Sequence, residues 1–286
     1  MKIKLLVLGI AVLTVIIGFS MISCGEEENG PKIPNISVPK PSEIKADISG
    51  ATPPTITNDT EAFEFLSAVF SSAVSNIQIS DISVLQDILS YIMSDITFPM
   101  YNQRKIYSQS QRIDIKLAEY DGDLEEYGVD LKGNISGSLT YSFNDITYET
   151  SAYGNINADC SLGYDNKKNT QINTDDVFVM DIKFKTNGSM SMTMSDTKKD
   201  FSVSAGSAVS LAMAYKDAKS GEGAKIILTG GFAGSVNMDL AFEADEIPNL
   251  DNINGSAALS IYSADNKLIY TFEMSLDDLQ QIGFFD

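Results

Sequence analysis

The chain of 286 residues contains no histidine and no tryptophan, and its only cysteines are Cys24 and Cys160. Without histidine, Ser-His-Asp triads, histidine acid–base shuttles and histidine-containing zinc sites are excluded. Two cysteines cannot build a disulfide framework. Carboxylates are plentiful, but no pair is singled out by its setting, and the acidic cluster at 121–126 lacks the spacing of a calcium loop. We therefore expect no enzymatic activity, no catalytic residues, no metal and no bound cofactor.

Positive charge is also scarce, since 20 lysines and arginines stand against 39 aspartates and glutamates, giving a net charge of −19. A chain this acidic is repelled by nucleic acid and by anionic membrane surfaces. We therefore expect no nucleic-acid partner.

The first 24 residues have the composition of a targeting segment. Lys2 and Lys4 precede an almost wholly apolar run over 5–22, which ends in Met21-Ile22-Ser23-Cys24. This arrangement resembles bacterial lipoprotein precursors, whose signal ends in a small residue before a cysteine that is acylated. The resemblance implies a signal peptide over 1–23, a covalent diacylglycerol or acyl lipid on Cys24, and a protein anchored to a membrane of the bacterial cell envelope. The alternative is an uncleaved helical anchor, because 18 apolar residues are just enough to span a bilayer.

Residues 24–57 differ in composition from the rest of the chain. Three glutamates open this segment, and six of the eight prolines lie between Pro31 and Pro54. Prolines at this density prevent regular helix, and no hydrophobic period is present. We predict a disordered acidic, proline-rich tether over 24–57, followed by a single folded domain over 58–286.

Two amphipathic helices are predicted at the start of that domain, over 59–77 and 82–94, each with one apolar stripe. Asn58 and Glu61 have capping-box spacing at the start of the first helix. The apolar stripes need a partner, and the sheet predicted below provides one.

Five long segments then alternate apolar and polar residues, over 129–143, 146–164, 176–194, 201–215 and 226–242. A period of two sustained over such lengths indicates strands with one buried face and one wet face. Shorter alternating segments lie at 112–117, in a strand that begins after Arg104, and at 256–263 and 268–274. The sequence predicts a mostly β (α+β) fold of about eight strands, arranged as a strongly curved antiparallel meander or incomplete barrel, with the two helices packed on its apolar face.

Small residues interrupt the apolar face near the middle of each long strand. If the turns lie near 144–145, 165–175, 196–200 and 217–223, Gly137 faces Ala152, Ala152 faces Gly188, Gly188 faces Ser207, and Ala205 faces Gly234. Two interpretations stay open: the small residues permit bending of the sheet, or they form a groove for an apolar ligand. The groove would be lined by Gly137, Ala152, Gly154, Gly188, Met190, Ser207 and Gly234.

Two functions fit these observations. The first is a non-enzymatic, lipid-anchored envelope protein that binds or carries a lipid or other apolar small molecule in the groove of its curved sheet. In outline it resembles the half-barrel lipoprotein carriers of the bacterial envelope. The alternative is a surface-exposed structural or adhesin-like lipoprotein with a fully packed core and no ligand. We further expect at least one of the two helices, 59–77 or 82–94, to cross the apolar face over Gly188.

Overall fold

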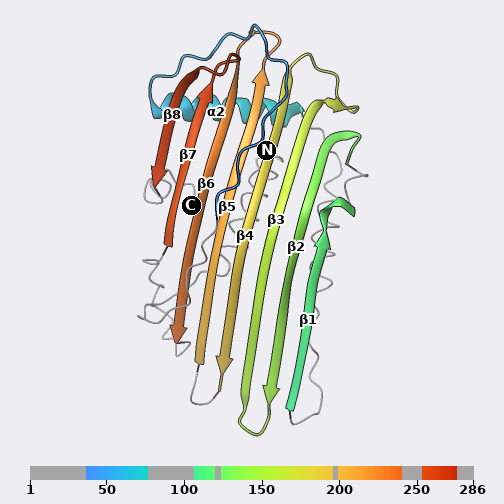
Figure 1. The fold of residues 1–286 in the computed structure, drawn as a ribbon, viewed down its shortest axis with the longest axis vertical. Coiled ribbons are helices and arrows are strands. Elements are labelled where there is room, and N and C mark those ends of the chain that lie inside the picture. Colours follow the sequence, from blue (N-terminus) through green and yellow to red (C-terminus); the bar gives the residue numbers. More distant parts are fainter. Residues whose placement is uncertain (1–36, 77–105, 120–123, 196–198, 240–252, 276–286) are drawn as a thin grey trace.

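The computed structural model describes residues 37–76, 106–119, 124–195, 199–239 and 253–275. Its main element is one sheet of eight strands in the order β1-β2-β3-β4-β5-β6-β7-β8, and every neighbouring pair is antiparallel (Figure 1). The strands are β1 (Ile106–Lys116), β2 (Tyr127–Asn144), β3 (Glu149–Asn169), β4 (Val177–Met194), β5 (Lys199–Lys216), β6 (Gly223–Asp239), β7 (Ile253–Tyr262) and β8 (Leu268–Ser275).

The predicted antiparallel meander of about eight strands is confirmed. Alternation of side chains fixes which residues share a face, and each predicted segment coincides with a strand to within a few residues. The sheet does not close on itself: β1 and β8 form opposite edges of one open layer (Figure 1). Its strands of 18 residues are long, about 60 Å each at the usual rise per residue.

One helix, α2 (Asp59–Asn76), crosses the apolar face of the sheet near the end where β4 begins (Figure 1). Its start follows the predicted capping pattern: the amide of Glu61 donates to Asn58 Oδ1 at 2.9 Å, and Glu61 Oε2 accepts from the amide of Thr57 at 2.7 Å. The predicted helix over 82–94 lies outside the described residues. A short 3-10 turn, η1 (Leu117–Glu119), follows β1.

The core lies between α2 and this end of the sheet. Ala62 and Val69 of α2 pack with Met180, Met213 and Ile226, and each of these five residues is at most 4% exposed. At the rim of the same core, the rings of Phe63 and Phe272 meet edge to face with centroids 5.5 Å apart. We call this region of the apolar face, which α2 covers, the upper half.

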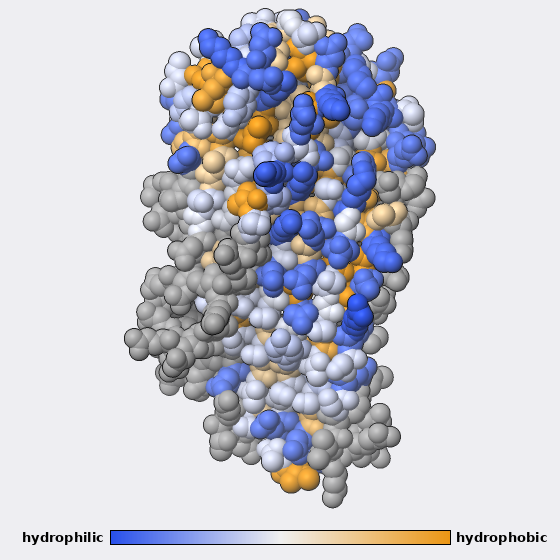
Figure 2. All heavy atoms as spheres, viewed as in Figure 1, coloured by the Kyte–Doolittle hydropathy of each residue, from blue (hydrophilic) through white to orange (hydrophobic). Residues whose placement is uncertain are grey.

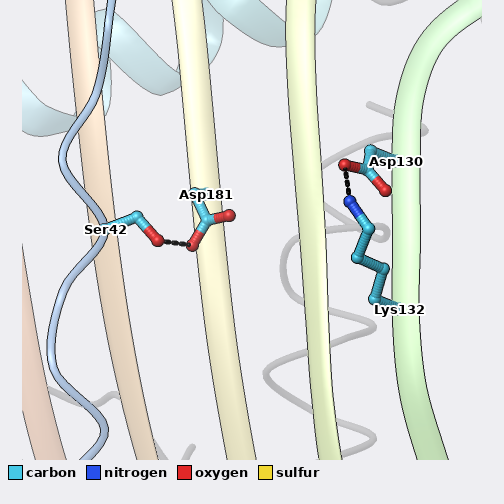
Figure 3. A network of polar contacts seen from close by, with 4 residues as sticks. All are labelled: Ser42, Asp130, Lys132 and Asp181. Atoms are coloured by element: carbon cyan, nitrogen blue, oxygen red, sulfur yellow. Dashed lines mark hydrogen bonds and ion pairs between the residues drawn. The ribbon is translucent and has the colours of Figure 1, made fainter.

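The opposite face of the sheet carries an extended stretch of chain, residues 37–57, which we call the N-terminal segment. It runs along β4 and β5 in front of the sheet, while α2 lies behind (Figure 1). Ser42 Oγ donates to Asp181 Oδ1 at 2.7 Å (Figure 3), and Lys216 Nζ donates to the carbonyl of Ser49 at 2.8 Å. Farther from the segment, Lys132 pairs with Asp130 on the same face of β2 (Figure 3). Of the predicted tether over 24–57, the described part is therefore bound to the sheet.

Small residues on β5 accommodate the N-terminal segment. On the face that this segment crosses, β5 presents Gly206, Ala208, Ser210, Ala212 and Ala214, all of them buried. Their short side chains let the extended chain approach the sheet, and Ile48 of the segment is only 2% exposed. The interior of this protein thus has two layers, one on each side of β5. Among the described residues, no helix is both long and apolar enough to cross a membrane.

Candidate functional site

The seven residues predicted to line a groove all lie on the apolar face, as their parity requires. The structure places three of them, Gly137, Gly188 and Gly234, in one row across the sheet, in which Gly188 pairs with Ala205 and Ala205 with Gly234. Gly154 and Met190 pair with each other in the adjacent row toward the β2–β3 turn, and Ala152 lies one row farther. Of the predicted cross-strand pairs, only Ala205 with Gly234 is confirmed.

The other three predicted pairs are wrong by two or four residues. Gly137 faces Ile156, and Ala152 faces Met192. The reason for the first shift is the turn between β2 and β3, where Asn144 pairs with Glu149 and four residues form the loop instead of two. Because these shifts are even, every side chain keeps its predicted face, but its neighbours across the strand change.

The corrected register interrupts the predicted groove. Ile156 stands between Gly137 and Gly188 in the central row. A Cβ atom added at Gly188 would lie 3.5 Å from the Ile156 side chain, and one added at Gly154 would lie 3.4 Å from the side chains of Leu139 and Met190. Side chains of the sheet itself therefore lean over these two glycines. The row of small residues is not a continuous channel.

Helix α2 does not cross the apolar face over Gly188, and the other helix predicted for that position, over 82–94, lies outside the described residues. The core contacts of α2 include Met180, which precedes Gly188 on β4 by eight residues, or about 27 Å along the strand. The reason is where the bulky residues lie: β4, β5 and β6 carry their largest well-buried side chains at Phe178, Met180, Leu211, Met213 and Ile226. An amphipathic helix gains most by covering these residues rather than a row of glycines.

The apolar face below Thr186 and Ser207 differs from the upper half, and we call it the lower half. On β2, β3 and β4 its bulky side chains are half-buried, whereas Val203 of β5, which pairs with Met190, is 1% exposed. The half-buried set comprises Leu139, Tyr141, Phe143, Ile156, Met190 and Met192. Met194, at the end of β4, is 41% exposed. The lower half is therefore apolar surface that the described part of the chain leaves partly accessible to solvent.

A buried hydroxyl pair separates the two halves. Thr186 Oγ1 and Ser207 Oγ lie 2.8 Å apart on neighbouring strands, and Thr186 Oγ1 donates to the carbonyl of Gly206 at 3.0 Å. Ser207 is 1% exposed and Thr186 is 6% exposed. Because these hydroxyls satisfy each other, Ser207 belongs to the packed interior and does not line a ligand groove.

On the opposite face, a shallow polar depression of about 290 Å³ lies beside the start of the N-terminal segment. It is lined by Ser37, Asn134, Asn157, Ala158, Asp159, Lys185, Thr186 and Asn187. Lys185 Nζ and Asp159 Oδ2 form an ion pair at 2.9 Å across its floor. Amide side chains can bind neutral polar groups, but the depression's charges neutralise each other, so it has no strong attraction for an ion. Sequence reasoning did not single out these residues, because most of them are ordinary polar residues on a wet strand face.

The other candidate positions are Cys160, Cys24 and the acidic cluster. Cys160 is half-buried, and burial, followed by the charge of Asp159, raises the pKa of its thiol to about 11. A thiol with so high a pKa is a poor nucleophile at neutral pH. No group of three or more His, Cys, Asp or Glu side chains within the described ranges could hold a metal ion. Cys24 and residues 120–123 of the acidic cluster lie outside those ranges.

Comparison of the chain with protein-family models, with curated proteins and with solved structures finds no match.

Proposed function

We propose that this protein is a non-enzymatic, lipid-anchored lipoprotein of the bacterial cell envelope that binds a lipid or similar apolar molecule on the lower half of its apolar face. The observation that carries the proposal is the contrast between the two halves of that face. The core residues that pack with α2, Met213 and Ile226 among them, are almost fully buried, whereas the bulky side chains of β2, β3 and β4 from Leu139 to Met192 remain half-buried. Contiguous apolar surface that stays accessible to solvent favours an apolar partner.

The residue types of the lower half also support this binding. Met190, Met192 and Met194 alternate along β4 on the apolar face. Methionine side chains are flexible and polarisable, so they can adapt to acyl chains or rings of varied shape. Because Ile156 divides the row of glycines, the ligand lies across the apolar surface next to Met190 and not in a continuous channel. We also propose that the sheet is strongly curved and that a second helix forms over 82–94.

The membrane anchor is proposed from the leader. The apolar run over 5–22 and its close in Ser23-Cys24 support acylation of Cys24. The acyl lipid would be the only covalently attached group, and it holds the acidic body beside the membrane without charge attraction.

A second function is favoured by one specific observation. The side chains of Ile156, Leu139 and Met190 fill the space above Gly188 and Gly154, as expected if the sheet only packs against its own chain. In that case the protein is a structural or adhesin-like surface lipoprotein without a ligand.

Native mass spectrometry of the full-length protein, purified from bacterial membranes in mild detergent, tests the choice. We expect the wild type to carry a non-covalent lipid mass in addition to its covalent acyl chains. Met190→Asp places a charge on the lower half and should lose that mass, whereas Met190→Leu should keep it.

Ser191→Asp is the matched control, because it places the same charge one residue along β4 on the opposite, exposed face. Circular dichroism establishes that each variant is folded. If the wild type carries only its covalent acyl chains, the ligand-free structural function replaces the proposal.

A further inference from the structure

The turn between β2 and β3 exposes two large apolar side chains at one end of the molecule. Ile146 is 67% exposed and Tyr148 is 68% exposed. Met194, which pairs with Thr150 just beyond this turn, is 41% exposed. The β2–β3 turn is the lowest part of the sheet in Figure 1, and apolar spheres lie at the same end in Figure 2, on a face that is otherwise largely hydrophilic.

The backbone of this turn holds the two side chains outward. Asn144 Oδ1 accepts hydrogen bonds from the amides of Ile146 at 3.0 Å and Thr147 at 3.4 Å. Tyr148 has a φ of 50°, in the left-handed region that a bulky aromatic residue rarely adopts. A turn selected only for compactness would use glycine or asparagine at this position. A tyrosine there indicates that the side chain itself is used.

The direction of the N-terminal segment brings the chain toward the same end. Followed backwards, the segment passes Lys216 at Ser49, Asp181 at Ser42 and Gly231 at Val38, so it descends the sheet toward the β2–β3 turn. Ser37 borders the polar depression beside Asn187, which lies seven residues, or about 24 Å, above Met194. Ser37 lies thirteen positions after Cys24, and a chain of this length can span about 45 Å when extended.

We propose that the end of the sheet bearing the β2–β3 turn contacts the bilayer surface, with Ile146 and Tyr148 inserted among the lipid headgroups. This inference rests on the proposed anchor at Cys24, which would bring this end to the membrane. Tyrosine is a favoured residue at membrane interfaces, because its ring is apolar and its hydroxyl is polar. Asp145 and Glu149 flank the two side chains, so the contact is with zwitterionic lipid and does not depend on anionic headgroups.

The absence of tryptophan from the chain provides a direct test. Tyr148→Trp introduces a single tryptophan at the proposed contact, and Leu268→Trp introduces one at the opposite end, where Leu268 is 50% exposed. Each full-length lipidated variant is reconstituted into phosphatidylcholine vesicles with and without brominated acyl chains. We expect bromine to quench the fluorescence of the Tyr148→Trp variant at least about twofold more than that of the Leu268→Trp variant. The difference should persist in high salt.

Equal quenching of the two variants, or none in either, would overturn the proposal. Ile146→Ser in the Tyr148→Trp background should reduce the quenching, because half of the apolar contact is removed. Acylation is read separately from the intact mass of the same samples. Loss of the acyl mass would therefore show failure of the anchor, whereas an acylated protein without selective quenching would show failure of the contact. A non-covalent lipid mass in either sample would report ligand binding at the lower half of the apolar face, and it would not test the contact of the β2–β3 turn with the bilayer.

Discussion

The upper and lower halves of the apolar face are built from the same strands with the same alternation, and they differ in what their side chains contact. In the upper half, Met213 and Ile226 are at most 1% exposed because α2 lies on them. In the lower half, Ile156 and Met190 are half-buried. Alternation therefore determines which face is apolar, but the sizes of the side chains along each strand determine where a covering helix binds. Of the described residues, α2 covers only the upper half.

The largest expected effect comes from truncating matched residues in the two halves. Ile226→Ala removes a side chain that is 0% exposed and should lower the free energy of unfolding by about 2–5 kcal/mol. Ile156→Ala, on the same face in the lower half, should cost less than about half as much, because its side chain is already partly hydrated. Urea denaturation of both variants measures the difference. Equal losses would mean that the two halves are packed alike.

The next effect concerns the N-terminal segment, which lies on the face of the sheet opposite α2. Ile48→Ala should destabilise the protein by about 2 kcal/mol, near the lower end of the range for buried residues, because the N-terminal segment can rearrange. Limited proteolysis should then cut within 37–57 faster than in the wild type. Val38→Ala is the control, since Val38 is 44% exposed. Equally rapid cleavage of the wild type in this region would show that the segment is a free tether.

Two glycines of the apolar face should differ in their response to substitution by alanine. Gly133 has a φ of 107°, and an added Cβ would lie 2.1 Å from the carbonyl oxygen of Asp159. Gly133→Ala should therefore cost about 1–3 kcal/mol in unfolding free energy. At Gly188 the nearest atom would lie 3.4 Å away, so Gly188→Ala should be neutral or stabilising by about 0.5 kcal/mol. A comparable loss at both positions in thermal denaturation would contradict this distinction.

The smallest effect concerns Cys160, which lies between the two halves. Its thiol pKa of about 11 predicts that, at pH 8, a disulfide reagent modifies the folded Cys24→Ala variant about 100-fold more slowly than the urea-unfolded chain. The raised pKa also sets the sign of a pH effect. Above about pH 8.5 the unfolded thiol loses its proton before the folded one, so stability falls as pH rises toward 11. Modification at equal rates would show that the thiol is freely hydrated.

Much of the sheet could be predicted from the sequence, because a period of two identifies strands and faces without knowledge of contacts. The register could not, because it depends on turn geometry: the loop from Asp145 to Tyr148 has four residues, and nothing in the alternation shows its length. The position of α2 depends on where bulky side chains, Phe178 and Met213 among them, gather on three strands. The alternation of apolar and polar residues does not show this.

The sequence does contain a sign that the N-terminal segment packs on the sheet. From Ser204 to Ala214, β5 is small or apolar on both parities, which is unusual for a strand with one wet face. This pattern indicates burial on both faces. The proline-rich composition of 37–57 pointed to disorder, yet an extended chain without regular helix also suits a channel lined by Ala208 and Ala212. Composition alone does not distinguish these two outcomes.

The central claim, that the lower half of the apolar face binds a lipid, is tested most directly by photo-crosslinking in living cells. A benzophenone amino acid is placed at Met190, on the apolar face, or at Ser191, on the opposite face, and the irradiated full-length protein is analysed by mass spectrometry. We predict a lipid adduct from position 190 and none from position 191. Adducts of equal yield at both positions, or crosslinks from position 190 only to the protein's own chain, would contradict the claim.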